Sequence, residues 1–390
     1  MPPPSNFLIV GAGFSGAVLA RELASKADCK ILVIDERTHV AGNCHTERDS
    51  GTGIMLHVYG PHIFNTNNLR VWEYVNRFDR FRPFLNRVKA CTSRGIFSLP
   101  INLHTINQFF GRTFSPAEAK SFVESLGDKT IVEPRNFEEQ ALKTIGRDLY
   151  ETFFAGYTRK QWGCDPGELP PSILKRLPIR FNYDDNYYDT KYQGIPERGY
   201  TAVIQALLEH PSIEVQTGRL YRRGEEAGRF DHVFYTGSLD AYFDYSLGRL
   251  GYRTATFERI DSRGDYQGNP VINYPDASIP WTRIHEHKHF APWEQHELTV
   301  AFREYSKETE KADLPFYPKR LVQDRKLLLE YRLMAETLKG VAFLGRLATY
   351  RYMDMEKVVE EALEFSELFL ENWRQGTSIP VFANLSHNPE

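Results

Sequence analysis

The sequence predicts an α/β protein in which a Rossmann-like nucleotide-binding domain carries an inserted helical domain and an antiparallel β-sheet domain. Three observations lead to this prediction. Residues 6–37 follow a pattern of strand, glycine turn, helix and second strand; apolar residues recur at helical spacing from about 86 to 155; and residues from roughly 248 to 317 alternate with a period of two. Because the 390 residues exceed the roughly 250–300 of a single core, we expect more than one domain.

The N-terminal glycine turn predicts dinucleotide binding. The apolar residues 7–10 are typical of a buried parallel strand, and they end at the sequence Gly-Ala-Gly-Phe-Ser-Gly of residues 11–16. Gly11 permits the tight turn, Gly13 lets the backbone approach a pyrophosphate, and Gly16 lets the following helix pack closely on the strand. The positive N-terminal end of that helix would then face the phosphates.

The second strand of this unit supplies the acid that such a site needs. Residues 31–34 are apolar and run into Asp35, 19 residues beyond Gly16, where dinucleotide-binding units bind ribose hydroxyls. Residues 36–44 follow on the side expected for the nucleotide. The alternative is a glycine-rich turn in an ordinary strand–helix unit, which would not require the acid. The cofactor-binding candidates of the stretch are Gly11, Gly13, Phe14, Ser15, Gly16, Asp35, Glu36 and Asn43.

Residues from 86 to 155 change to a helical pattern. Ser115, Pro116 and Glu118 supply the cap, the first-position proline and the first-turn acid of a helix N-terminus. We interpret this segment as a helical insertion, the alternative being that it belongs to the nucleotide domain. The absence of further strand–helix–strand patterns in it favours an insertion.

The stretch between residues 150 and 200 is rich in aromatic residues. It holds 11 of them in 51 positions, many of them tyrosines, against 13% for the whole chain. Tyrosine and tryptophan combine an apolar face with a polar tip, which suits a cleft for a base and a sugar. Basic residues lie among them. Single-stranded nucleic acid is the alternative ligand, but the balanced charge and the lack of a repeated pattern favour a small nucleotide.

The chain then returns to the nucleotide domain. Residues 202–208 predict a helix, and residues 213–215 and 231–237 predict strands, the second of which runs into Gly237. The period-two alternation that follows, for example over residues 298–305, predicts an antiparallel sheet.

Three histidines, His285, His287 and His289, would share one face of a strand in this sheet. We favour hydrogen-bonded histidines over a metal site, because no cysteine partner and no carboxylate on that face are expected.

The C-terminal part predicts a second corner for an anion. Residues 341–344 form a buried-type strand that ends at Gly345 and Arg346, and in a cofactor with two phosphates this turn would lie opposite the first one. A long amphipathic helix follows Asp354, and its apolar stripe is typical of core packing.

Composition limits the partners and the location. The 48 basic and 51 acidic residues give a net charge of −3, which argues against nucleic acid or a membrane surface as partner. We expect no membrane span and a cytoplasmic protein, because no apolar run approaches about 18 residues and the N-terminus lacks the features of a signal peptide. The four cysteines are scattered without a CxxC pair, so we expect them to be reduced.

Several longer motifs resemble those of the bacterial UDP-galactopyranose mutases, over residues 6 to 382. These motifs are Gly-Pro-His-Ile-Phe (60–64), Ser-Ile-Leu-Lys-Arg-Leu-Pro (172–178), Phe-Asn-Tyr-Asp-Asp-Asn-Tyr (181–187), Pro-Trp-Thr-Arg-Ile (280–284), Glu-His-Lys-His-Phe (286–290) and Gly-Arg-Leu (345–347) with Tyr-Arg-Tyr-Met-Asp-Met (350–355).

The resemblance implies a flavoenzyme that interconverts UDP-galactopyranose and UDP-galactofuranose, the galactofuranose being used in cell-surface glycans. It implies reduced FAD, whose N5 attacks the anomeric carbon and displaces UDP before the ring opens through an iminium and recloses. It also implies a six-stranded antiparallel sheet, a homodimer and a separate flavin reductant.

With this resemblance, we divide the chain into four parts. They are an FAD-binding Rossmann-like domain (1–85, 200–245 and 318–382), a helical domain (86–155), an antiparallel sheet and substrate domain (156–199 and 246–317) and a tail (383–390).

The resemblance also assigns site residues by position. It implies catalytic roles for Arg176, Arg283 and His62, and the two arginines can hold a diphosphate as charge develops on it. The substrate-binding residues that it implies are Asn86, Phe153, Phe154, Tyr157, Trp162, Arg176, Tyr187, Asn273, Arg283, Tyr317 and Tyr352. Tyr188, next to Tyr187, is an alternative at that position. The further cofactor-binding residues that it implies are His62, Gly345, Arg346, Tyr352, Asp354 and Met355.

Two other classes remain as alternatives. A flavin-dependent oxidoreductase of the amine-oxidase type shares the N-terminal turn and a C-terminal flavin segment, but it needs a hydride-donor pocket and leaves the two arginines without a role. A nucleotide-sugar binding protein without catalysis would use the same cleft for affinity alone.

Overall fold

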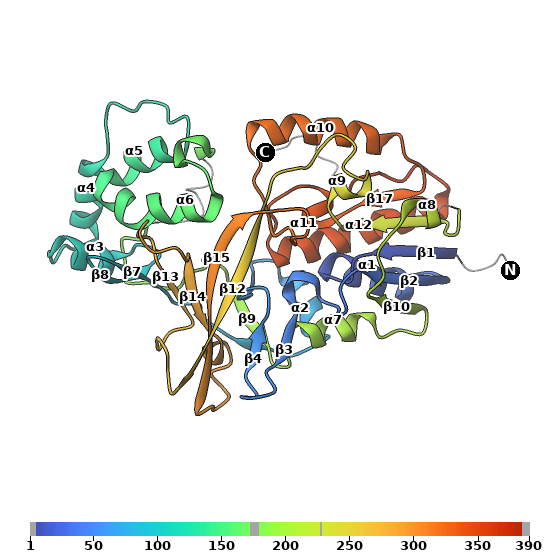
Figure 1. The fold of residues 1–390 in the computed structure, drawn as a ribbon, viewed down its shortest axis with the longest axis horizontal. Coiled ribbons are helices and arrows are strands. Elements are labelled where there is room, and N and C mark those ends of the chain that lie inside the picture. Colours follow the sequence, from blue (N-terminus) through green and yellow to red (C-terminus); the bar gives the residue numbers. More distant parts are fainter. Residues whose placement is uncertain (1–4, 172–178, 227, 384–390) are drawn as a thin grey trace.

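A five-stranded parallel sheet forms the nucleotide-binding part of the chain (Figure 1). The computed structural model describes residues 5–171, 179–226 and 228–383. In spatial order the strands are β10 (Ile213–Thr217), β2 (Cys29–Asp35), β1 (Ser5–Val10), β11 (His232–Tyr235) and β17 (Val341–Phe343). All four pairs are parallel, which confirms the predicted Rossmann-like sheet and the strands expected at both ends of the chain.

Helices cover both faces of this sheet because its strands are apolar on both faces. In β1, Phe7 and Ile9 belong to one buried cluster and Leu8 and Val10 to the other. The first cluster is completed by α1 (Phe14–Lys26), α7 (Tyr200–Leu208) and the long α12 (Met355–Gln375), and the second by α9 (Leu239–Tyr242) and α10 (Val322–Glu336). The apolar stripe of α12 is therefore core, as predicted.

A second, seven-stranded sheet lies beside the parallel one in Figure 1. Its strands are β16 (Tyr317–Pro318), β12 (Tyr252–Arg263), β15 (Leu298–Glu308), β14 (Arg283–Glu286), β13 (Val271–Asn273), β7 (Val88–Thr92) and β8 (Gly95–Leu99). The expected six antiparallel strands are wrong in detail, because β13 pairs with β7 in parallel and the hairpin of β7 and β8 extends the sheet. That hairpin lies in the segment expected to be helical. The hairpin forms there because β7 pairs with β13, about 180 residues further along the chain, and no local sequence pattern predicts such a pairing.

The helices of the predicted insertion begin after this hairpin. They are α3 (Leu103–Phe110), α4 (Pro116–Leu126), α5 (Phe137–Tyr150) and a π-helical stretch (Glu151–Ala155). One more helix, α6 (Gly156–Trp162), follows directly, beyond the predicted end at residue 155 and within the segment assigned to the sheet domain. The predicted cap of α4 is confirmed: the Glu118 carboxylate accepts the Ser115 N–H at 2.8 Å, and the Ser115 hydroxyl accepts the Glu118 N–H at 3.4 Å. The division of the chain into domains stays a prediction.

Short elements accompany the two large sheets. They are a three-stranded sheet of β5 (Phe64–Thr66), β9 (Tyr192–Pro196) and β6 (Phe81–Pro83), the pair β3 (Thr46–Arg48) and β4 (Met55–His57), and the helices α2 (Leu69–Asn76), α8 (Arg223–Glu226) and α11 (Gly345–Ala348). Figure 1 shows α8 on the side of the parallel sheet away from the seven-stranded sheet. Over the ranges that the structure describes, no helix is long and apolar enough to cross a membrane.

The three histidines after Arg283 do not share a strand face. β14 ends at Glu286, and His287–Phe290 form a 3₁₀ helix, so the prediction of one continuous strand is wrong. His285 and His287 are fully buried, and His289 lies near Glu286, with its Nε2 3.4 Å from a carboxylate oxygen. The strand thus ends at Glu286, whose side chain binds the backbone of residues 266–268.

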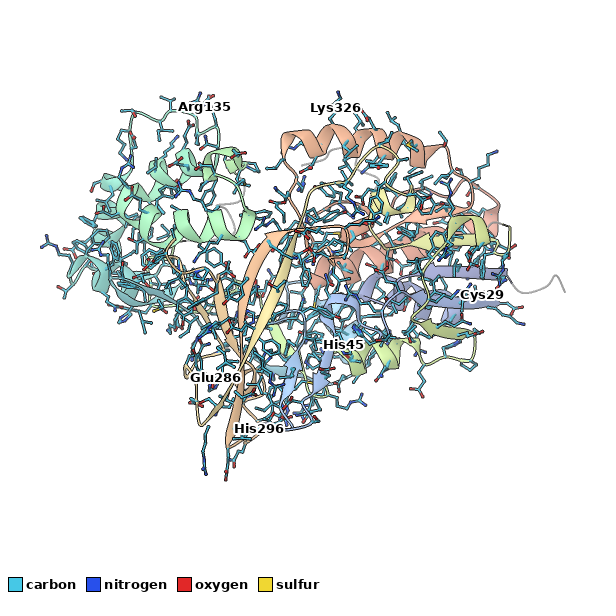
Figure 2. All side chains as sticks on the ribbon, viewed as in Figure 1. Cys29, His45, Arg135, Glu286, His296 and Lys326 are labelled. Atoms are coloured by element: carbon cyan, nitrogen blue, oxygen red, sulfur yellow. The ribbon has the colours of Figure 1, made fainter. Side chains whose placement is uncertain are left out.

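Glu286, which is labelled in Figure 2, is buried and accepts hydrogen bonds from one whole turn. Its carboxylate accepts the N–H groups of Tyr266 and Gln267, both at 2.8 Å, and of Gly268 at 3.0 Å, with the Thr299 hydroxyl at 2.7 Å. Asp265 and His289 are close enough to form a metal-ligand set with it, but four donors already occupy the Glu286 oxygens and Lys288 pairs with Asp265 at 2.5 Å. The cluster is therefore explained by structural hydrogen bonding.

Replacing Glu286 with glutamine is expected to destabilise the fold, because an amide NH₂ would face donors. Burial opposes ionisation, but His289 and the backbone N–H groups outweigh it and lower the pKa of Glu286 to about 2. An unfolded glutamate titrates near about 4.3, so this stabilisation is present above that pH and is lost as the pH falls toward about 2. We expect Glu286→Gln to cost about 1.5–3 kcal/mol at pH 7 and less at pH 3.

Thermal unfolding at the two pH values measures this difference. The control is Glu297→Gln, because Glu297 is exposed and its ion pair with the exposed Arg263 is a long one, 3.7 Å from Oε2 of Glu297 to Nη2 of Arg263. An equal loss of stability in both variants, or a loss that does not shrink in acid, would contradict the assignment.

Candidate active site

A cavity of about 1290 Å³ lies between the carboxyl edge of the parallel sheet, α6 and the seven-stranded sheet. Gly11 and Gly13 line one part of it, and Tyr157, Arg283 and Tyr317 line another. A pocket for one small ligand measures roughly 300–1000 Å³, so this cavity has room for two.

The glycine turn at the edge of β1 has the geometry that the sequence predicts. Gly11 has a φ of +107°, and a Cβ there would lie 2.0 Å from the Thr236 hydroxyl oxygen. A Cβ on Gly13 would meet nothing within 4 Å, whereas a Cβ on Gly16 would lie 2.0 Å from the Gly11 carbonyl oxygen. Gly13 therefore faces open space in the cavity wall, and Gly16 is where α1 contacts the turn.

The N-terminal end of α1 suits an anion. Its cap residue, Gly13, has no side chain to accept the first N–H groups, and no acidic residue lies in its first turn. Asp35 accepts the N–H of Ala12 at 2.8 Å and of Arg37 at 2.9 Å. Asp35 thus fixes the turn itself, while the neighbouring Glu36 is exposed at the cavity wall.

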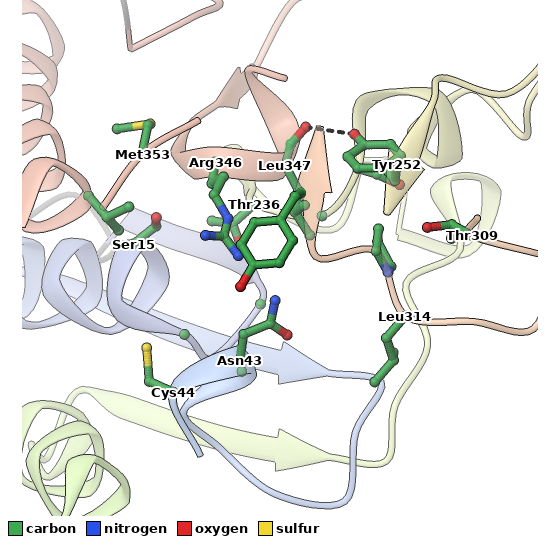
Figure 3. A pocket seen from close by; sticks show the side chains of 18 of the residues that line it. Ser15, Asn43, Cys44, Thr236, Tyr252, Thr309, Leu314, Arg346, Leu347 and Met353 are labelled. Atoms are coloured by element: carbon green, nitrogen blue, oxygen red, sulfur yellow. Dashed lines mark hydrogen bonds between the residues drawn. The ribbon is translucent and has the colours of Figure 1, made fainter. Parts of the chain in front are cut away.

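The predicted second anion-binding turn, at Gly345 and Arg346, lies next to the first one, the glycine turn of residues 11–16. Figure 3 shows Ser15, Asn43, Thr236 and Arg346 around the same space. Gly345 has a φ of +84°, and a Cβ there would lie 2.3 Å from the Ser15 hydroxyl oxygen. Because the Gly345 N–H already donates to Glu361 at 2.9 Å, an anion at this corner would depend on the Arg346 side chain, which lies 5.2 Å from the Tyr317 ring centre.

Arg283 supplies the positive charge on the opposite wall. Its Nε donates to Glu304 at 2.8 Å across the pair of β14 and β15, and His285 Nε2 lies 3.0 Å from the same carboxylate oxygen. Burial opposes ionisation of Glu304, but Arg283 and His285 outweigh it and lower the pKa of Glu304 to about 2. The carboxylate is therefore charged at neutral pH and orients the guanidinium.

Tyrosines surround this guanidinium. Tyr317 stacks on Tyr352 with ring centres 5.9 Å apart, and Trp162 lies 6.4 Å from Tyr352. Burial raises the pKa of Tyr157, Tyr187 and Tyr317, and the nearby Arg283 charge only partly offsets this. The phenols stay protonated, so each can donate a hydrogen bond to a bound oxygen anion.

His62 is neutral and lies in the cavity wall, between the part lined by the glycine turn and the part lined by Arg283. Burial and the Arg346 charge lower the pKa of His62 to about 4. Its Nδ1 lies 2.8 Å from the Gly60 carbonyl oxygen. A carbonyl can only accept, so Nδ1 carries the proton and Nε2 is an acceptor.

The structure brings most of the predicted site residues together. Those that line the cavity are Gly11, Gly13, Phe14, Ser15, Asp35, Glu36, Asn43, His62, Tyr157, Trp162, Tyr187, Arg283, Tyr317, Arg346, Tyr352, Asp354 and Met355. Gly16 and Gly345 support the wall from behind. Arg176 lies outside the described residues.

Four predicted substrate-binding residues do not line the cavity. Phe153 and Phe154 are buried in the core of the helical segment, where Phe153 packs edge-on against Phe97. Asn86 is buried behind Tyr187, whose N–H donates to the Asn86 carbonyl oxygen at 2.8 Å. Asn273 pairs with Arg283 across β13 and β14. The two phenylalanines are explained by core packing, and the two asparagines support residues of the wall.

Sequence reasoning missed the residues that orient the site. Glu304 holds Arg283 through the pairing of β14 with β15, and His285 contacts Glu304; this pairing leaves no local signal. Thr236 packs on Gly11, and the only sequence hint is the Thr-Gly that ends the predicted strand. Gln161 and Tyr188 also line the cavity, and Tyr188 was recognised only as an alternative to Tyr187.

The fold and the cavity define a class of enzyme that uses a dinucleotide-type cofactor next to a second, anionic ligand. A family model described as NAD(P)-binding Rossmann-like domain matches residues 9–78. A second, described as UDP-galactopyranose mutase, matches residues 152–352 and so spans the tyrosines and Arg283.

Whole-chain comparisons agree with the second match. The chain is 52% identical to a Klebsiella pneumoniae protein named "Probable UDP-galactopyranose mutase", over 97% of this chain and 98% of that one. It is 50% identical to a dTDP-fucopyranose mutase of Escherichia coli, over 94% and 99%. A crystal structure of reduced UDP-galactopyranose mutase superposes with a TM-score of 0.72 at 15% identity, covering 99% and 100% of the two chains.

This chain belongs to the UDP-galactopyranose mutase family, and it is an enzyme of the isomerase class. The family match confirms the predicted resemblance. It favours the mutase over the two alternatives, the oxidoreductase and the non-catalytic binding protein. A flavin cofactor follows from the family and the Rossmann-like domain together.

Proposed function

We propose that the protein interconverts UDP-galactopyranose and UDP-galactofuranose. The observation that carries the proposal is that Arg283 and its ring of tyrosines share one cavity with the glycine turn of the cofactor domain. A nucleotide-sugar diphosphate at Arg283 would have its sugar between that anchor and the cofactor. Such a product would supply galactofuranose to the enzymes that build glycans.

We further propose FAD as the cofactor, in its reduced form. The residues present fit it: the uncapped N-terminal end of α1 and the open face of Gly13 suit one phosphate, and Arg346 suits the other. Glu36 suits a ribose. Reduced FAD would supply the nucleophile, its N5, that displaces UDP from the anomeric carbon. We expect a separate reductant and a homodimer, as the sequence resemblance implies, and a cytoplasmic location, as the N-terminal sequence and the lack of a long apolar run predict.

The chain's own residues bind and stabilise the leaving diphosphate. Arg283, charged and oriented by Glu304, faces the charge that grows as the sugar–oxygen bond breaks. The protonated phenols of Tyr157, Tyr187 and Tyr317 donate to its oxygens. We propose that Tyr352 and Arg176 donate to the same diphosphate. His62 presents an acceptor nitrogen at the cofactor side of the cavity.

Turnover of UDP-galactofuranose by dithionite-reduced protein tests the proposal. We expect conversion to UDP-galactopyranose on chromatography, a yellow protein before reduction, and almost no conversion by the oxidised protein. Conversion without reductant would contradict the need for reduced FAD, and its absence with reductant would contradict the mutase activity.

A second candidate substrate is dTDP-fucopyranose, because the 50% identical Escherichia coli relative carries that name. The two substrates differ in base, ribose and sugar, but both place a diphosphate at Arg283. Parallel assays with the two nucleotide sugars distinguish them by kcat/KM. We expect the UDP-sugar to be preferred, and a higher value for the dTDP-sugar would reassign the substrate while keeping the mutase chemistry.

A further inference from the structure

Lys160 inserts its ammonium into a ring of backbone carbonyls. Lys160 Nζ donates to the carbonyl oxygens of Tyr274, Asp276, Ile279 and Trp281 at 2.5–3.0 Å. These four oxygens belong to the loop that joins β13 to β14. An ammonium has three N–H donors and no acceptor, so two of the four oxygens share one donor and the single charge interacts with the whole loop. Burial lowers the pKa of Lys160 to about 8, although the nearby Asp276 carboxylate partly offsets this by raising it.

A second contact joins the same helix to the same loop. A Cβ on Gly156 would lie 2.3 Å from the Pro275 carbonyl oxygen and 3.1 Å from the Ala277 nitrogen. Gly156 and Lys160 are four residues apart, so they lie on one face of α6. The start of α6 can therefore approach the loop only without a side chain, and Lys160 fixes it there.

The neighbouring face of α6 belongs to the cavity. Tyr157 and Gln161 line it, again four residues apart. The C-terminal end of α6 is held separately, since the Gln161 carbonyl accepts Arg253 Nε at 3.1 Å and the Ser306 hydroxyl at 2.8 Å. Figure 1 shows α6 beside the end of β15. Lys160 is thus the link from the Tyr157 wall to the loop between Asn273 and Arg283.

We propose that Lys160 is a positioning residue, whose ammonium sets the separation of Tyr157 and Arg283 and so determines how tightly the enzyme binds a diphosphate. This inference rests on the proposed function for its substrate, but the ring of carbonyls is a property of the chain itself. Without the ammonium, the four oxygens would form a cage that a monovalent cation fits, because carbonyl oxygens replace the hydration shell of K⁺.

Two variants separate the charge of Lys160 from its bulk. Lys160→Ala removes the ammonium and leaves room for an ion, whereas Lys160→Met removes the charge and fills the space. We expect both to weaken UDP binding and to raise KM by about tenfold to hundredfold, with a smaller change in kcat. Potassium or ammonium chloride at 0.2 M should restore binding to the alanine variant only. Tetramethylammonium chloride at the same concentration controls for ionic strength.

UDP binding by the oxidised holoenzyme, followed by calorimetry in Tris buffer at pH 7, is the first measurement, and turnover of the reduced enzyme is the second. Wild-type affinity in both variants would overturn the proposal, and so would a defect that neither cation reduces in Lys160→Ala. Absence of turnover in the wild type, with UDP binding intact, would instead contradict the proposed function and leave the binding test of Lys160 valid.

Discussion

Arg283→Ala is expected to lower kcat/KM for the nucleotide sugar by about a hundredfold or more. Arg283 is the charged group that faces the cavity from β14, and each charge-assisted hydrogen bond that it makes to a diphosphate is worth about 1.5–3 kcal/mol. Because the charge on the leaving group grows in the transition state, kcat should fall as well as affinity. Steady-state kinetics of the reduced enzyme, with substrate above KM, measures the two effects separately.

This substitution also leaves Glu304 buried without its partner. Glu304 is 1% exposed, and breaking a buried pair from one side costs about 3–5 kcal/mol, so we expect part of the loss of activity to come from lower stability of the fold. The double variant Arg283→Ala with Glu304→Gln removes the isolated charge. We expect it to regain thermal stability while activity stays low, and recovery of activity in it would contradict a direct role of the guanidinium.

Two further variants divide the role of Arg283 between charge and orientation. Arg283→Lys keeps the charge but cannot donate to Glu304 and to a diphosphate through one planar fork. Glu304→Gln keeps the arginine and weakens the contact that orients it at 2.8 Å. We expect losses of about tenfold in each, mostly in kcat for the lysine variant, as charge without bidentate geometry supports binding better than catalysis.

The parts of the fold with local patterns could be predicted from the sequence. The five parallel strands and α12 follow from apolar runs and periodicity, and the cap of α4 follows from three residues. The hairpin Val88–Leu99 could not be predicted, since its pairing with β13 joins segments far apart in the chain. The turn at His287 was missed as well, and the contacts of Glu286 beside it are again with distant residues, the N–H groups of residues 266–268.

The same distinction, between local patterns and long-range pairing, explains which site residues could be predicted. The glycine turn is a short motif whose geometry is almost wholly local, and each glycine has the environment that the pattern predicts. Arg283 was identified only through a resemblance, and its partner Glu304 was not identified at all, while His285 was expected only to be a hydrogen-bonded histidine. Glu304 meets Arg283 through strand register, and register is determined by which faces are buried across the whole sheet.

Gly16→Ala is expected to abolish flavin retention by disrupting the turn, whereas Gly13→Ala is expected to weaken flavin binding with the fold intact. A Cβ on Gly16 would overlap the Gly11 carbonyl oxygen at 2.0 Å, and backbone cannot move aside as a flexible side chain can. Overpacking of this kind costs about 1–3 kcal/mol or more. On Gly13 the same methyl group meets no protein atom within 4 Å, so only a bound phosphate would meet it.

The two variants are matched, because each adds one methyl group to the same turn. Absorbance of the purified proteins in the flavin band gives cofactor content, and thermal unfolding of the apoproteins gives the stability of the turn itself. We expect the Gly16 variant to lose both, and the Gly13 variant to retain apoprotein stability while its flavin affinity falls by about tenfold or more. Full flavin content in Gly13→Ala would show that the phosphates do not approach the backbone at that residue.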